Sequence, residues 1–218
     1  MIEVLNPNSS AKMTEAIAES CRSTGIAPER WRVDRLCAAP SSIETGDDVE
    51  LARRLVKRRG SAASALIIAC HADPGVADAR TAHPLVLGIG ETSMRAAASA
   101  FSSFGVMTVS DAAAERKRAA LSAYGLLEKC AALEATGRSP LDGLRPDADP
   151  RPYLDAAARI VRAGAGGIVL GCAGMAPLRE LISRSVGVPV IDPVAVTLDL
   201  ASRLVGRDEG AEDQRPFA

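Results

Sequence analysis

Two of the five cysteines in this 218-residue chain have local sequences suited to proton-transfer chemistry. Cys70 ends an apolar stretch and is followed by His-Ala-Asp-Pro-Gly, and Cys172 ends another and is followed by Ala-Gly-Met-Ala-Pro. Each therefore enters a turn of small residues before a predicted helix. Backbone N–H groups in such a turn favour a thiolate over a thiol, relative to the usual pKa of about 8.5. The same N–H groups are suited to holding an enolate oxygen.

Two thiols that face one cleft from opposite sides can invert a stereocentre. A carbon acid held between them loses a proton to one sulfur and gains a proton from the other. The alternative role is structural, because a buried cysteine often packs as a small hydrophobic residue. We expect that role for Cys21, Cys37 and Cys130, which lie on or beside apolar segments without such turns. For Cys70 and Cys172 the local sequence leaves both roles open.

Other polar residues give weaker signals. The segment Asn-Pro-Asn-Ser-Ser at 6–10 suits either a helix cap or the binding of a carboxylate, a carbonyl or a ring imide. The two histidines, His71 and His83, have no clustered carboxylates, so we expect no catalytic metal. The glycines at 88–90 lack the spacing of a nucleotide-binding loop.

Composition excludes several classes of partner. The chain has 26 basic and 27 acidic residues, a formal charge of -1 and only 3% aromatic residues, which argues against nucleic-acid binding. No apolar run approaches the roughly 20 residues that cross a bilayer, and the N-terminus does not resemble a signal peptide. We therefore expect no membrane partner and a cytoplasmic location. Widely spaced cysteines without a CxxC pair argue against disulfides and structural zinc.

The elements that would position the two cysteines follow an alternating pattern. Short apolar stretches alternate with longer alanine-rich segments of helical period, which is typical of an α/β fold with parallel sheets. Predicted strands are 2–5, 31–37, 65–69, 86–89, 105–109, 167–170 and 188–191, and predicted helices are 11–22, 48–59, 92–103, 111–128, 153–164, 175–185 and 194–205. Both cysteines follow strand ends, the edge at which parallel sheets bind ligands.

Three further segments complete the prediction. Residues 130–136 fit either a helix end or a short strand, because alanine dominates them. Residues 137–152 hold four prolines and are expected to be largely loop. The polar residues 207–218 are expected to fray.

The two halves of the chain resemble each other. The sequence Leu-Ile-Ile-Ala-Cys at 66–70 matches Ile-Val-Leu-Gly-Cys at 168–172, an offset of 102 residues. The strands predicted at 2–5 and 105–109 both end just before hydroxyl-bearing or amide residues and a helix. Repetition of a strand, turn and helix at this distance predicts two similar lobes.

An ordered set of motifs resembles the aspartate, glutamate and hydantoin racemase superfamily, most closely its hydantoin and allantoin racemase branch. The motifs are NPNSSxxMT at 6–14, APSSIE at 39–44, ACHADPG at 69–75, GIGE at 88–91 and LGCAGM at 170–175. The similarity runs from about residue 1 to 205. It implies two α/β lobes related by a pseudo-twofold axis, with the active site between them. Residues 1–91 plus 192–218 would form the first lobe, residues 92–191 would form the second, and 130–136 would be a strand.

The resemblance also implies an activity. It leads us to expect an isomerase, a cofactor-independent racemase of a 5-substituted hydantoin or allantoin-like small molecule. Cys70 and Cys172 would be its acid and base. A homo-oligomer is expected, without cofactor or metal. The alternatives are a racemase of free aspartate or glutamate, a related isomerase or decarboxylase, and a non-catalytic ligand-binding module.

Substrate contacts are carried over by position. Asn6 and Ser10 would hold the polar edge of the ligand, and Ile43 and Val109 would lie near its variable substituent. His71 and Ala173, which follow the two cysteines, are also expected to contact substrate. His71 departs from the hydantoin branch, which usually has an aromatic or small residue there, and this leaves the identity of the substrate open.

Overall fold

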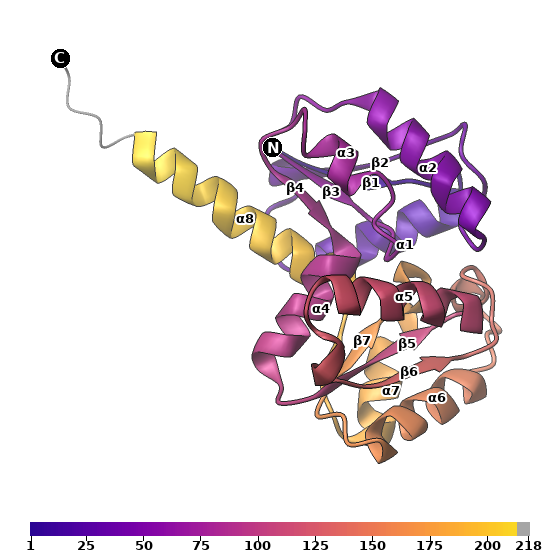
Figure 1. The fold of residues 1–218 in the computed structure, drawn as a ribbon. Helices are drawn as coiled ribbons and strands as arrows, with labels where there is room; N and C mark the ends of the chain where they lie inside the picture. Colours follow the sequence, from indigo (N-terminus) through magenta and orange to yellow (C-terminus); the bar gives the residue numbers. More distant parts are fainter. Residues whose placement is uncertain (213–218) are drawn as a thin grey trace.

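The computed structural model of the protein describes residues 1–212 and contains two parallel sheets, each flanked by helices (Figure 1). The first sheet has the order β2-β1-β3-β4 and the second has the order β6-β5-β7-β8. The strands are β1 Ile2–Asn6, β2 Trp31–Arg35, β3 Ala65–Ile68, β4 Val86–Gly88, β5 Phe104–Thr108, β6 Cys130–Ala135, β7 Ile168–Leu170 and β8 Val190–Ile191. All pairings are parallel. The identical strand order confirms the predicted α/β fold of two similar lobes.

Burial explains which apolar stretches became central strands. Every residue of β1, β3, β5 and β7 is buried, as expected for strands covered by helices on both faces. In the edge strand β2 half-buried and exposed residues alternate. Residues 130–135 of the ambiguous segment form β6, an edge strand of the second sheet, which pairs with β5.

The helices agree with the prediction except at their ends. They are α1 Ala11–Arg22, α2 Gly46–Arg59, α3 Val76–Ala79, α4 Ile89–Ala100, α5 Asp111–Ala123, α6 Arg151–Arg162, α7 Arg179–Val186 and α8 Pro193–Glu212, with short 3-10 turns at Pro28–Arg30, Leu127–Lys129, Asp142–Leu144 and Ala173–Leu178. Helix α3, a single turn, follows the turn after Cys70, where a helix start was expected but no helix range was predicted. The segment predicted as one helix at 175–185 is a 3-10 turn containing Pro177 followed by α7, because proline disrupts regular helical hydrogen bonding.

The largest errors in the predicted helix ends are those of α5 and α8. Helix α5 ends at Ala123 and not at residue 128, because Gly125 adopts the left-handed conformation (φ 69°) that commonly stops a helix. Helix α8 continues to Glu212, beyond the predicted end at 205. Part of the segment expected to fray, 213–218, lies outside the described residues.

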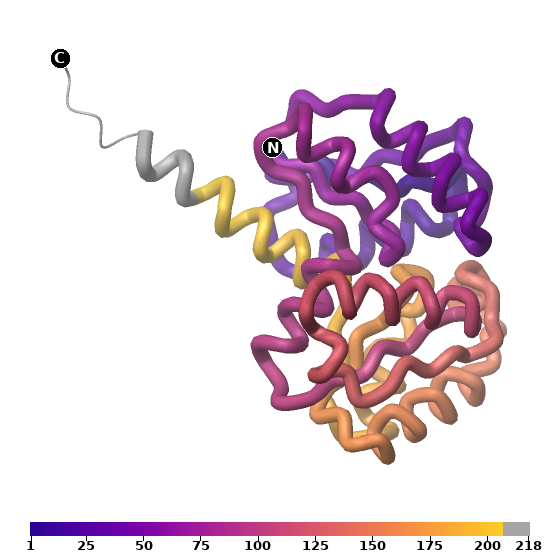
Figure 2. The backbone as a smooth tube through the Cα atoms, viewed as in Figure 1, coloured from indigo at the N-terminus to yellow at the C-terminus, as the bar shows by residue number. Residues whose placement is uncertain are grey.

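The chain crosses between the lobes twice, and Figure 2 shows both crossings. It leaves the first lobe through α4 and returns through α8, which packs against β1, β3 and β4. The predicted domain boundary between residues 91 and 92 falls inside α4 and stays a prediction. No helix within residues 1–212 is both long enough and apolar enough to span a bilayer.

Close packing of a helix on the second sheet gives a test of the fold. A Cβ added to Gly105 in β5 would lie 2.3 Å from Cγ2 of Ile160 in α6. We expect Gly105→Ala to lower the free energy of unfolding by about 1–3 kcal/mol, measured by urea denaturation. The control is Gly166→Ala, where the nearest atom to the new Cβ is 3.5 Å away. Equal losses in the two variants would contradict this packing.

Candidate active site

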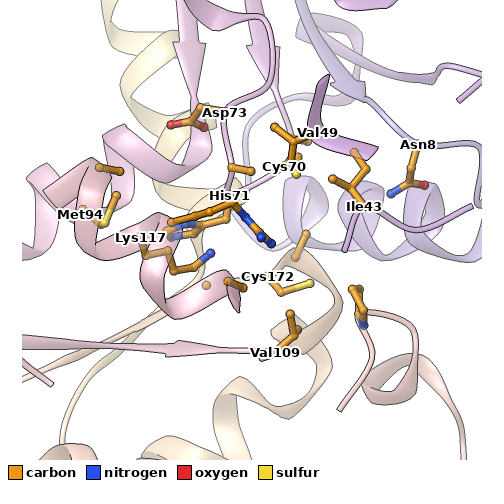
Figure 3. A pocket seen from close by; sticks show the side chains of 18 of the residues that line it. Asn8, Ile43, Val49, Cys70, His71, Asp73, Met94, Val109, Lys117 and Cys172 are labelled. Atoms are coloured by element: carbon orange, nitrogen blue, oxygen red, sulfur yellow. The ribbon is translucent and has the colours of Figure 1, made fainter. Parts of the chain in front are cut away.

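A cavity of about 120 Å³ lies between the lobes, and both predicted cysteines line it (Figure 3). Cys70 follows β3 by two residues and Cys172 follows β7 by two residues, so equivalent strands of the two lobes supply the two thiols. The cavity is much smaller than the roughly 300–1,000 Å³ typical of sites for drug-sized ligands. It is therefore suited to a compact molecule held between two sulfur atoms.

The turns after the two cysteines act on the sulfurs in the same way. A backbone N–H two residues further on, from Ala72 in one lobe and Gly174 in the other, donates to the sulfur and lowers the pKa of the thiol. The sequence prediction that these turns leave a net preference for thiolate was wrong. Burial outweighs the N–H groups, raising the pKa of Cys70 to about 12 and also raising the pKa of Cys172.

Asn6 and Ser10 do not line the cavity. Asn6 is fully buried, and its amide group donates to Oδ1 of Asn8 and Oγ1 of Thr14, both at 3.0 Å. Ser10 caps α1, since its hydroxyl accepts from the backbone N–H of Met13. The structure thus places these two residues behind the cavity wall, where they support the segment that forms it.

Asn8, which lies in the segment 6–10 but was not among the predicted contact residues, takes the place expected for Asn6. Its Oδ1 accepts from the amide of Asn6 and from the backbone N–H of Ser10, at 3.0 and 2.9 Å. Because both bonds use the oxygen, the amide nitrogen remains for a ligand in the cavity that Asn8 lines. The Asn-Pro-Asn motif was the available signal, although it does not distinguish the supporting asparagine from the one that lines the cavity.

The remaining predicted contact residues all line the cavity. Ile43, Val109 and Ala173 form part of its apolar wall, and His71 contributes an imidazole. The loop that holds Ile43 is tied to the other lobe, because the guanidinium of Arg116 donates to the backbone oxygen of Glu44 at 2.7 Å.

Asp73 fixes the first cysteine's loop to the start of α4. Its carboxylate accepts the backbone N–H groups of Gly90 and Glu91, at 2.8 and 2.6 Å. Burial nevertheless raises the pKa of Asp73 to about 6. A Cβ on Gly88 would lie 2.4 Å from this carboxyl group, so the glycines of the GIGE motif permit this close approach.

Lys117 is a second residue that was not among the predicted contact residues. It lies on α5, lines the cavity and is only 7% exposed. Burial lowers its pKa, while the two thiolates and Asp73 raise it. In the sequence it stands inside the run Arg-Lys-Arg. Such a run is typical of a solvent-exposed helix face, so the pattern did not indicate that this lysine is buried. Within residues 1–212 no group of three or more His, Cys, Asp or Glu side chains is arranged to hold a metal.

Comparison with known proteins identifies the family. The family model described as Asp/Glu/Hydantoin racemase matches residues 2–201. The chain belongs to this racemase family. It is 33% identical to a hydantoin racemase of Rhizobium meliloti over 216 residues, which cover 94% of this chain and 88% of that one. It is 30% identical to a hydantoin racemase of Pseudomonas sp. (strain NS671) over 213 residues, covering 94% and 85% of the two chains.

A solved structure shows the same two-lobed arrangement. The allantoin racemase from Klebsiella pneumoniae superposes with a TM-score of 0.83 at 32% sequence identity. The superposition covers 95% of this chain and 88% of that one. The fold and the family are thus shared over almost the whole chain.

The raised thiol pKa values predict slow alkylation of the free protein. Because burial raises the pKa of Cys70 to about 12, its thiolate fraction at neutral pH is small and increases with pH. We expect iodoacetamide to modify Cys70 slowly at pH 7 and progressively faster up to pH 10, as followed by peptide mass spectrometry. The exposed Cys37 serves as the internal reference. A rate at Cys70 that levels off below the ordinary thiol pKa of about 8.5 would contradict the effect of burial.

Proposed function

We propose that the protein is a cofactor-independent racemase of a 5-substituted hydantoin or allantoin-like compound, with Cys70 and Cys172 as its acid and base. The observation that carries the proposal is the meeting of these two thiols, from equivalent strand ends of opposite lobes, at one small cavity. The names of the hydantoin and allantoin racemases that the chain is similar to support the substrate class.

The reaction needs one thiolate and one thiol. The thiolate removes the proton from the ring stereocentre, and the electron pair of that C–H bond forms a double bond to the adjacent carbonyl carbon. The carbonyl π pair moves to the oxygen, which gives an enolate. The second cysteine then donates its proton to the opposite face of the carbon. The two sulfurs have exchanged protonation states, so the enzyme is ready for the other enantiomer.

Burial of the sulfurs serves this reaction in one respect and hinders it in another. A thiol whose pKa is raised gives a thiolate that is a stronger base toward a weakly acidic C–H bond. The same burial makes that thiolate rare. The N–H groups of Ala72 and Gly174 and the charge of Lys117 oppose the effect, since each lowers the pKa of a thiol.

The residues of the cavity wall suit a ring substrate that carries a small apolar substituent. Ile43, Val49 and Val109 form an aliphatic surface, and the amide of Asn8 supplies a donor. An amide donor and an aliphatic wall suit a ring carbonyl and a small substituent, respectively.

Isotope exchange tests the proposed function. Incubation of one enantiomer of a 5-substituted hydantoin or of allantoin in deuterated buffer is expected to cause loss of optical rotation together with deuterium incorporation at the stereocentre. Polarimetry and mass spectrometry follow the two quantities. Faster exchange on free aspartate or glutamate would favour the amino-acid alternative. No exchange on any of these compounds would refute racemisation and leave a ligand-binding module.

The two cysteines are tested by separate substitutions. We expect Cys70→Ala and Cys172→Ala each to lower the racemisation rate by at least about 100-fold, because each removes a proton carrier. Ligand affinity, measured by calorimetry, should change little. The control is Cys37→Ala, since that thiol is exposed and lies outside the cavity. Full racemisation by either alanine variant would exclude the two-cysteine mechanism.

Two other expectations stay predictions. Sedimentation analysis would test the homo-oligomeric state, and cell fractionation would test the cytoplasmic location.

A further inference from the structure

The ammonium of Lys117 is a buried cation for which the described residues provide no direct partner. The side chain is 7% exposed, and only longer-range charges, with no hydrogen bond, act on it. A buried charge is costly unless another group compensates it. Since Lys117 lines the cavity, a bound molecule can supply that compensation.

The backbone beside Cys172 is shaped to admit this lysine. A Cβ on Gly171 would lie 2.6 Å from Cε of Lys117 and 2.4 Å from the backbone oxygen of Met107. The glycine therefore leaves the space that the lysine stem occupies. Figure 3 shows the stem extending toward Cys172 and the imidazole of His71. The ammonium is thus held beside the cysteine pair, and not on the helix surface.

The hydrogen bonds of Ser93 determine which nitrogen of His71 carries a proton. The Ser93 hydroxyl lies 2.6 Å from the backbone oxygen of Ile89 and 3.2 Å from that of Gly90, so its single hydrogen is directed to the backbone and not to His71. It therefore accepts from Nε2 of His71, which lies 3.3 Å away. Burial and the charge of Lys117 keep the pKa of His71 well below its usual value, so the ring is neutral. Its Nδ1 then carries a lone pair.

This nitrogen belongs to a residue that lines the cavity. His71 is 6% exposed and lines the cavity, and its Nδ1 is buried without a hydrogen-bond partner among the described residues. The cavity therefore presents a cationic donor, Lys117, and a neutral acceptor, His71. Such a pair is complementary to a group in which an oxygen and an N–H stand on adjacent atoms, as in the H–N–C=O edge of a ring ureide.

We propose that Lys117 and His71 bind this edge, with Lys117 donating to the carbonyl oxygen that becomes the enolate and His71 Nδ1 accepting the neighbouring ring N–H. The assignment rests on the proposed function, because it places the carbonyl next to the stereocentre between the two thiols. Lys117 transfers no proton. It neutralises the charge that reaches the oxygen when the C–H pair forms the carbon–carbon double bond. Lys117 is thus a catalytic residue, and His71 fixes the ring orientation.

Kinetics of Lys117→Met give the first test. Methionine keeps most of the length of the stem and removes the charge. Loss of an oxyanion donor typically costs about 100-fold to 1,000-fold in kcat, and we expect a loss of that size in deuterium exchange with little change in KM. The matched control is Lys12→Met on the exposed surface of α1, which should leave exchange unchanged. Thermal unfolding monitors whether each variant is folded.

Binding of two probes gives a test that needs no turnover. Barbiturate is a planar ring ureide that is already an enolate anion at neutral pH, and 5,5-dimethylhydantoin is a neutral ring ureide without an exchangeable C–H. Lys117→Met should weaken barbiturate binding by at least about tenfold, or about 1.4 kcal/mol, and affect dimethylhydantoin much less. Methylation of dimethylhydantoin at N3 should weaken its binding to the native protein. It should have little effect on binding to His71→Phe, which lacks the acceptor.

The outcomes separate the inference from the proposed function. Suppose that the native protein causes no exchange, and that Lys117→Met binds barbiturate no better than dimethylhydantoin. This result would refute the racemase and support binding of the H–N–C=O edge by Lys117 and His71. Exchange that Lys117→Met leaves at the native kcat would overturn the inference and leave the racemase standing. A defect confined to the KM of carboxylate-bearing hydantoins would also overturn it, since the ammonium would then bind the substituent. If neither probe binds the native protein, the proposed binding of a ring ureide by Lys117 and His71 is refuted.

Discussion

Burial of polar groups between the two lobes is the constraint on which the site depends. It raises the pKa of both thiols, keeps His71 neutral and lowers the pKa of Lys117. In water these groups would be screened from one another, whereas in a small buried cavity each charge changes the protonation of its neighbours. The chemistry of the site is therefore a property of the cavity as a whole, and no single residue has it alone.

The fold creates this cavity by bringing two copies of one arrangement together. In each lobe the third strand in chain order lies beside the first and ends two residues before a cysteine. Parallel strands expose their carboxyl ends on one side of the sheet, so joining the lobes at those ends brings the cysteines to a common space. Helices α4 and α8 carry the chain across, and the Arg116 bond to Glu44 ties the cavity wall on the other side.

The apolar runs were sufficient to predict seven of the eight strands and the repeat, because such runs depend on local composition. The strand at 130–136 and the roles of the two cysteines came from the family resemblance. Asn8 and Lys117 were not predictable in this way. Choosing between Asn6 and Asn8 requires knowing which of the two amide groups is already hydrogen-bonded within the protein. Those hydrogen bonds depend on how the loop packs on α1. Lys117 lies in a charged run, and its burial follows from the glycine opposite it on another segment. These features depend on tertiary contacts, which a local sequence pattern does not indicate.

The two lobes are alike in backbone but differ in the groups around each sulfur. His71 and Asp73 accompany the first cysteine, while the stem of Lys117 crosses the glycine beside the second. Mirror-image substrates therefore meet unequal surroundings. For a racemase, however, the equilibrium constant between enantiomers in an achiral solvent is unity, so the Haldane relation requires the same kcat/KM in both directions. The different surroundings of the two sulfurs can therefore change kcat and KM for the two enantiomers only by the same factor. They do not favour one enantiomer over the other at equilibrium.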